Sequence, residues 1–184
     1  MTDNEEVIVD SAISFSDAIE GTNAPEQIVD SLALVDVFYY SFDDKRHQGQ
    51  IIVNNDLEED VYEIFALIEK IKFPVGRVIP IVAYGWDDHS SMVENNSSSF
   101  NFRVIEGTTK LSLHSFGRAV DINPVQNPVI YPKGVIVPEG AKYSPPNAGT
   151  FSAKNPVVQK FVKRGWHWGG NFEQSKDYHH FEKP

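Results

Sequence analysis

The sequence predicts a single α+β domain. A length of 184 residues is enough for one hydrophobic core and small for two. Apolar, aromatic and β-branched runs over residues 35–40 and 50–54 predict strands. An apolar stripe with helical spacing predicts a long helix over residues 57–71. Strand and helix signals therefore occur in one short chain, as in α+β domains.

The long helix is the clearest element. Asp56 is expected to cap it, with Glu59 at the capping-box spacing, and Pro74 follows its end. The stripe consists of Leu57, Val61, Ile64, Phe65, Ile68 and Ile71. This pattern predicts one helical face packed on the core.

Other elements flank this helix. Residues 26–40 begin with a helix-like stretch before the first strand, and residues 78–84 are predicted to form a buried strand. A second helix is expected from Asn155, its cap, through Pro156 in the first turn to Gly165. Residues 124–155 hold six of the eleven prolines and show little periodicity. Because this segment follows Asp121, we expect it to form one wall of a site.

Charge is distributed unevenly along the chain. The net charge is −10, but residues 1–44 contain eleven acidic and no basic residues, so the remainder is close to neutral. Residues 1–24 are predicted to be an acidic tail or loosely attached segment, and residues 25–184 the domain. No basic face is evident, which argues against nucleic acid as a partner.

The sequence also limits the location and the type of metal site. No run of about 18 apolar residues occurs, so no membrane span is expected. The acidic start, Met1 to Glu6, is unlike the basic end of a signal peptide. The chain has no cysteine, so any metal has to be held by histidine and carboxylate.

Two short segments supply such ligands. His114 and Asp121 are seven positions apart, and Asp177 precedes His180 by three. Two histidines and one aspartate leave Zn²⁺ an open position for water, and a further carboxylate can accept the proton of that water. The spacing leaves open whether His179 or His180 is the ligand.

Strand geometry adds detail to both segments. If residues 117–123 form a strand, Asp121 shares a face with Gly117 and Ala119, which leaves space for an ion, while Val120 and Ile122 face the core. Asp177 and His180 have an odd separation, so a turn or bulge is expected between them.

Several separated motifs resemble one family of zinc peptidases. They are Ser-x-His-x-x-Gly-x-Ala-x-Asp at 112–121, Gly-Trp-His-Trp-Gly-Gly-Asn-Phe at 165–172, Asp-x-x-His-Phe-Glu at 177–182, and the segments 91–92 and 95–103. In this order they resemble the zinc D-alanyl-D-alanine carboxypeptidases and L-alanyl-D-glutamate endopeptidases, which include VanY-like enzymes of bacterial cell-wall metabolism. The resemblance covers roughly residues 30–184. It implies a hedgehog/DD-peptidase-like fold, with a small antiparallel sheet flanked by helices.

The resemblance also implies roles for individual residues. His114, Asp121 and His180 would bind zinc, Asp177 would be the general base, and Arg103 would stabilise the oxyanion. Ser112 would position the substrate and Trp168 would line the site. Trp166 and Trp168 are equally compatible with core packing.

The implied activity is hydrolysis of peptide bonds in peptidoglycan stem peptides. D-alanyl-D-alanine carboxypeptidase activity is preferred. Asp at 177 in place of Glu, and Asn171-Phe172 in place of Asp-Trp, keep an L-alanyl-D-glutamate endopeptidase as an alternative. Hedgehog signalling domains share this fold, so a non-catalytic zinc-binding module is a second alternative. The substrate favours the cell envelope or periplasm, although the chain shows no signal peptide.

Overall fold

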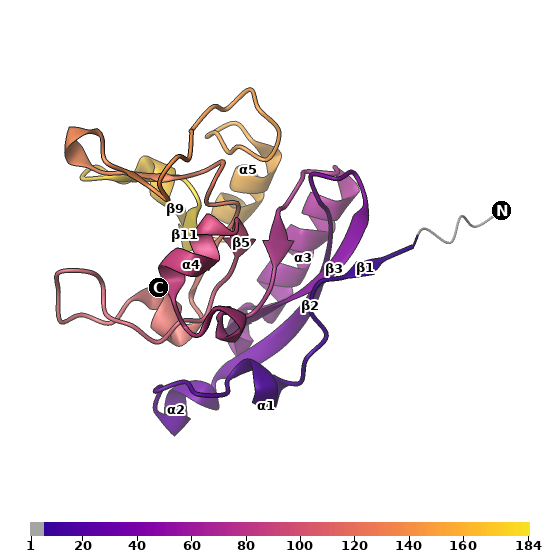
Figure 1. The fold of residues 1–184 in the computed structure, drawn as a ribbon, viewed down its shortest axis with the longest axis vertical. Helices are drawn as coiled ribbons and strands as arrows, with labels where there is room; N and C mark the ends of the chain where they lie inside the picture. Colours follow the sequence, from indigo (N-terminus) through magenta and orange to yellow (C-terminus); the bar gives the residue numbers. More distant parts are fainter. Residues whose placement is uncertain (1–5) are drawn as a thin grey trace.

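The computed structural model describes residues 6–184 and confirms a single α+β domain (Figure 1). Residues 1–5 of the predicted acidic tail lie outside the described residues. The strands are β1 Ile8–Val9, β2 Leu32–Tyr40, β3 Arg46–Asn54, β4 Arg77–Val78, β5 Asn96–Ser97, β6 Ala119–Asp121, β7 Val129–Ile130, β8 Ile136–Val137, β9 His167–Trp168, β10 Lys176–Asp177 and β11 His180–Glu182. The α-helices are α1 Phe15–Ala18, α2 Glu26–Val29, α3 Glu58–Lys70, α4 Asp88–Val93 and α5 Pro156–Lys163. Five 3-10 helices are η1 Asn55–Leu57, η2 Ile81–Tyr84, η3 Leu113–Phe116, η4 Pro132–Gly134 and η5 Gly169–Asn171.

A long two-stranded ladder lies in the N-terminal half of the chain. β2 and β3 are antiparallel and pair along their whole length, from Leu32 opposite Asn54 to Tyr40 opposite Arg46. Both predicted strands are therefore confirmed, although each is longer than predicted. Figure 1 shows α3 lying along this ladder. The main core gathers around this layer.

Helix α3 buries most of the predicted stripe, but Ile71 follows its end and is 41% exposed. The helix also begins differently from the prediction. Its buried apolar side chains are Val61, Ile64, Phe65 and Ile68. The expected cap at Asp56 is wrong, because the chain enters the helix through η1, whose first turn is capped by Asn54. Asp56 instead accepts hydrogen bonds from Arg118 at 2.9 and 3.0 Å. A partner distant in sequence therefore binds the carboxylate that the local pattern assigned to the helix.

The predicted strand over residues 78–84 is also wrong. Only Arg77–Val78 forms a strand, and it pairs in parallel with β5. Pro80 then precedes the 3-10 helix η2, which ends at Gly85 in a left-handed conformation (φ +60°). A proline has no N–H for a strand ladder, so the apolar run continues as a helical turn.

The described part of the predicted tail packs on the domain. β1 pairs in parallel with β3, placing Ile8 opposite His47. Ala18 is fully buried in a small apolar cluster with Leu32, Ile52 and Phe100. The proposed division at residue 24 stays a prediction, yet residues 8–18 make specific contacts with the rest of the molecule.

The second half contains the sheet that carries the site. Its strand order is β6-β11-β9, and α5 lies beside it (Figure 1). Helix α5 begins as predicted, with the Asn155 side chain accepting from the Val157 N–H at 2.9 Å. The rings of Phe161 and Phe181 stack with centroids 3.9 Å apart. This packing fixes β11 against the helix.

A network of ion pairs and hydrogen bonds joins α3 to the C-terminal part of the chain. Asp60 of α3 accepts hydrogen bonds from Arg164, Trp166 and Lys183, each at 2.8 Å. Burial alone would raise the pKa of Asp60, but the donors from Lys183 and Trp166 outweigh this effect and lower it. The carboxylate therefore connects α3 with the segment that follows α5 and with the C-terminus.

The proline-rich segment 124–155 contains a small sheet with strand order β10-β7-β8. Val129 of β7 pairs with Asp177 of β10, so this segment lies directly beside Asp177. Within residues 6–184, no helix has the length and apolar character needed to cross a membrane.

Candidate metal centre

Three separated elements bring the predicted ligands together. His114 lies in η3, Asp121 ends β6 and His180 begins β11. His180 is directly opposite Asp121 in the β6–β11 ladder. One ligand atom from each of these three residues lies within 4.8 Å of the others. The arrangement forms a group of donors that can hold a metal ion.

The facing atoms are closely spaced. His114 Nε2 is 3.2 Å from Asp121 Oδ2 and 3.2 Å from His180 Nδ1. His180 Nδ1 is 2.9 Å from Asp121 Oδ1. The side chains of His114 and Asp121 are buried, and that of His180 is 11% exposed. The group is therefore largely shielded from solvent.

The remaining ring nitrogens are held by acceptors outside the group. His114 Nδ1–H donates to the Ser99 carbonyl at 2.6 Å. His180 Nε2 lies 3.2 Å from Glu182 Oε2. Such partners select the tautomer that presents the opposite nitrogen to a metal. Ser99 and Glu182 were not predicted as site residues. The sequence could have indicated only Glu182, because it shares a strand face with His180.

Protonation of the group reflects its burial and its charges. Burial alone would raise the pKa of Asp121, but the charges of His114 and His179 hold it well below the usual range. Burial lowers the pKa of His180, yet hydrogen bonds with Asp121 and Glu182 outweigh this and raise it to about 10. A metal ion therefore has to displace a proton from His180.

His179 lies outside the group of three donors. Its ring is buried, and Nδ1–H donates to the Asn127 carbonyl at 2.8 Å. Its Nε2 is 3.2 Å from Asp177 Oδ1 and 3.9 Å from Asp121 Oδ2. The geometry thus favours His180 as the ligand and places His179 between Asp121 and the predicted base, Asp177.

Asp177 lies in β10, separated from β11 by the expected bend at residues 178–179. Its side chain is 22% exposed. Among residues 6–184, no group forms a well-aligned hydrogen bond with its buried Oδ1. A Cβ added at Gly169 would overlap the Asp177 carbonyl oxygen, so glycine allows the turn after β9 to approach this strand.

Arg103 contacts Asp88 through its side chain and Ser115 through its backbone. Its Nη2 is 2.9 Å from Asp88 Oδ2, and each side chain is about one third exposed. Its backbone N–H donates to Ser115 Oγ at 2.9 Å. Burial raises the pKa of Tyr131 and the charge of Asp177 raises it further, while the charge of Arg103 lowers it.

Ser112 and Trp168 form hydrogen bonds that support the segments of the site. The Ser112 hydroxyl accepts from the His114 N–H at 3.3 Å, which caps η3. Trp168 is 4% exposed, belongs to the core, and donates from Nε1 to the Tyr178 carbonyl at 2.9 Å. Both residues therefore hold segments that carry site residues, and their predicted contacts with substrate stay predictions.

The small residues before Asp121 have a packing explanation. Val120 and Ile122 lie in the core, as strand alternation predicts. Gly117, however, precedes the strand and adopts φ +63° as the end of η3. A Cβ at Gly117 would overlap the backbone of Asn54. This glycine therefore permits close packing on β3, not space for an ion as expected.

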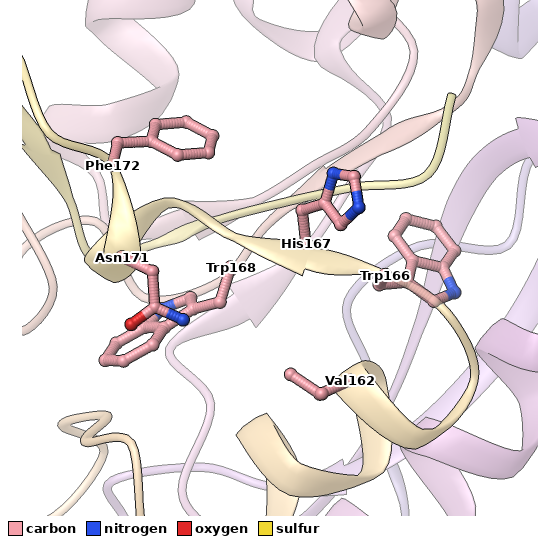
Figure 2. Close-up of a pocket in the computed structure, with 6 residues that line it drawn as sticks. All are labelled: Val162, Trp166, His167, Trp168, Asn171 and Phe172. Carbon is pink, nitrogen blue, oxygen red and sulfur yellow. The ribbon is translucent and has the colours of Figure 1, made fainter.

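A shallow, mostly apolar pocket of about 360 Å³ lies along β9 and η5. Figure 2 shows Trp168 and Asn171 on one side of this segment and His167 and Phe172 on the other. The ring of Phe172 is 6.1 Å from that of His180. The pocket thus adjoins the metal centre but contains none of its three donors.

Comparison with known proteins supports the family resemblance. Residues 106–183 match the model of a family described as D-alanyl-D-alanine carboxypeptidase. The match includes His114, Asp121, Asp177 and His180, whereas Arg103 precedes it. It confirms the predicted resemblance and supports a peptidase activity. Searches of curated proteins and of solved structures returned no significant match.

Proposed function

We propose that this chain, which matches the D-alanyl-D-alanine carboxypeptidase family over residues 106–183, is a zinc-dependent peptidase acting on peptidoglycan stem peptides. The bond we favour is that of terminal D-alanyl-D-alanine. One observation carries the proposal: ligand atoms of His114, Asp121 and His180 lie within 4.8 Å of one another. Such a substrate would place the activity in the cell envelope or periplasm.

The donors and their partners fit zinc. Two imidazoles and one carboxylate match the ligands of catalytic zinc sites, which keep one position open. The outer nitrogens of His114 and His180 already have acceptors, so the inner nitrogens can serve as ligands. A bound zinc ion would lower the pKa of water toward about 7 and polarise a carbonyl.

The chain's own residues supply the other steps. Asp177 would take the proton from the attacking water and pass it to the leaving amine. Its side chain is 22% exposed, and His179 Nε2 lies 3.2 Å from its buried Oδ1. Arg103 would donate to the oxyanion, and its contact with Asp88 would hold the guanidinium in place.

Mass spectrometry of muropeptides incubated with the zinc-loaded protein tests this proposal. Loss of terminal D-Ala would support carboxypeptidase activity. Separation of L-Ala from D-Glu would instead indicate the endopeptidase. No product from protein with confirmed bound zinc would contradict hydrolysis and favour a binding module.

Variants test the assigned roles. Asp177→Ala should keep zinc and lose turnover by about 10²- to 10⁴-fold, as expected for a general base. His114→Ala should lose the metal itself. Asp30→Ala, which changes an exposed carboxylate, is the control and should retain both properties. Normal cleavage by Asp177→Ala would refute its assignment as the base.

A further inference from the structure

Tyr131 lies beside the strand that carries Asp177. Val129 is directly opposite Asp177 in the β7–β10 ladder. Tyr131 follows two residues later in extended conformation (φ −79°, ψ 163°), and its N–H donates to the Val135 carbonyl at 2.8 Å. Alternate side chains of an extended strand share a face. The side chains of Tyr131 and Asp177 therefore lie on the same face of this small sheet.

Charges on other segments act on the Tyr131 phenol. Burial raises its pKa, the charges of Asp177 and then Glu106 raise it further, and Arg103 acts in the opposite direction. The effect of Asp177 agrees with its position on the same face of the small sheet.

The phenol is available to a ligand. Tyr131 is 39% exposed, and its hydroxyl makes no hydrogen bond to another residue in the described range 6–184. A tyrosine hydroxyl is protonated at neutral pH and can donate. Val135 and Ile136 of the same hairpin are also exposed, at 57% and 38%. The hairpin thus presents one polar donor and apolar side chains beside Asp177.

We propose that the Tyr131 hydroxyl donates a hydrogen bond to a backbone carbonyl of the peptide substrate and so positions the scissile bond beside Asp177. This inference rests on the proposed function. A main-chain carbonyl occurs in every peptide, so the contact would contribute to binding with either of the bonds considered above. Tyr131 would act on substrate and would leave the metal unaffected.

The test compares Tyr131→Phe with Tyr62→Phe in the full, zinc-loaded chain. Both changes remove one hydroxyl, and Tyr62 is 66% exposed on α3. We expect Tyr131→Phe to lower kcat/KM for muropeptide cleavage by about 3- to 10-fold, as for a lost neutral hydrogen bond. Zinc content and circular dichroism should stay unchanged. Equal kcat/KM values for the two variants would overturn the inference.

A binding measurement separates this inference from the proposed hydrolysis. Calorimetry with the same muropeptide in an Asp177→Ala background should show binding about 3- to 10-fold weaker after Tyr131→Phe. If the wild type binds without cleaving, the proposed hydrolysis fails, while this loss still supports Tyr131. Equal binding in both variants overturns the role of Tyr131. Absence of both binding and cleavage overturns both proposals.

Discussion

Replacing Glu182 with Gln should weaken zinc binding while the protein stays folded. Glu182 Oε2 lies 3.2 Å from His180 Nε2, on the side of the ring away from the metal centre. The carboxylate favours a proton on Nε2 and leaves Nδ1 free as a ligand. Gln keeps the length and an acceptor oxygen, but it removes the negative charge.

The structure sets the expected size of this effect. Loss of a partner outside the ligand shell generally costs about 10- to 100-fold in metal affinity, which corresponds to about 1.4–2.7 kcal/mol. The Glu182 side chain is 25% exposed, so water screens part of its charge. We therefore expect about a tenfold loss for Glu182→Gln and a larger loss, toward 100-fold, for Glu182→Ala.

Competition with a chromophoric zinc chelator measures the affinity directly. Glu173→Gln is the matched control, because Glu173 is exposed and precedes the metal-binding strand. Thermal unfolding of the metal-free variants checks that both remain folded. The reasoning is refuted if Glu182→Gln binds zinc as tightly as Glu173→Gln does.

Two further predictions concern protons and backbone geometry. The raised pKa of His180, about 10, means that its proton stabilises the metal-free protein fully below about pH 6.5, and this stability is lost as the pH rises through about 10. Zinc binding at pH 7 should therefore release about one proton from His180. The affinity for zinc should rise by up to about tenfold per pH unit between about pH 6 and 8. Calorimetry in buffers of different ionisation enthalpy measures the proton release, and finding none would contradict this prediction. Gly169→Ala should shift Asp177 and lower turnover by about 100-fold with zinc still bound, because the new Cβ overlaps the Asp177 carbonyl. Normal kcat in this variant, with zinc content measured in parallel, would disprove a requirement for glycine there.

Local patterns predicted strands β2 and β3, helices α3 and α5, and the candidate site residues. The stripe on α3, apart from the exposed Ile71, and the Asn155-Pro156 start of α5 depend on near neighbours in sequence, and the structure confirms them. Strand pairing places His180 directly opposite Asp121. The spacing left His179 and His180 equivalent, and the family resemblance selected His180.

Two local predictions failed because distant residues or a single proline decided the outcome. Aspartate is a residue type that often caps helices, but the carboxylate of Asp56 is bound by Arg118. Residues 78–84 are apolar enough for a strand, but Pro80 interrupts the ladder and η2 forms. Arg118 lies outside any short window around Asp56, whereas Pro80 lies within the predicted strand and is a local signal against it.

The sequence by itself determined the donor types, their order and the carboxylate beside them, because residue type and spacing are local properties. Only the tertiary structure decided what holds these groups. The Ser99 carbonyl holds His114, the Asn127 carbonyl holds His179, and strand pairing places Val129 opposite Asp177. Such contacts join residues far apart in the chain or use backbone atoms, so they arise only when the strands pair and the core closes around them.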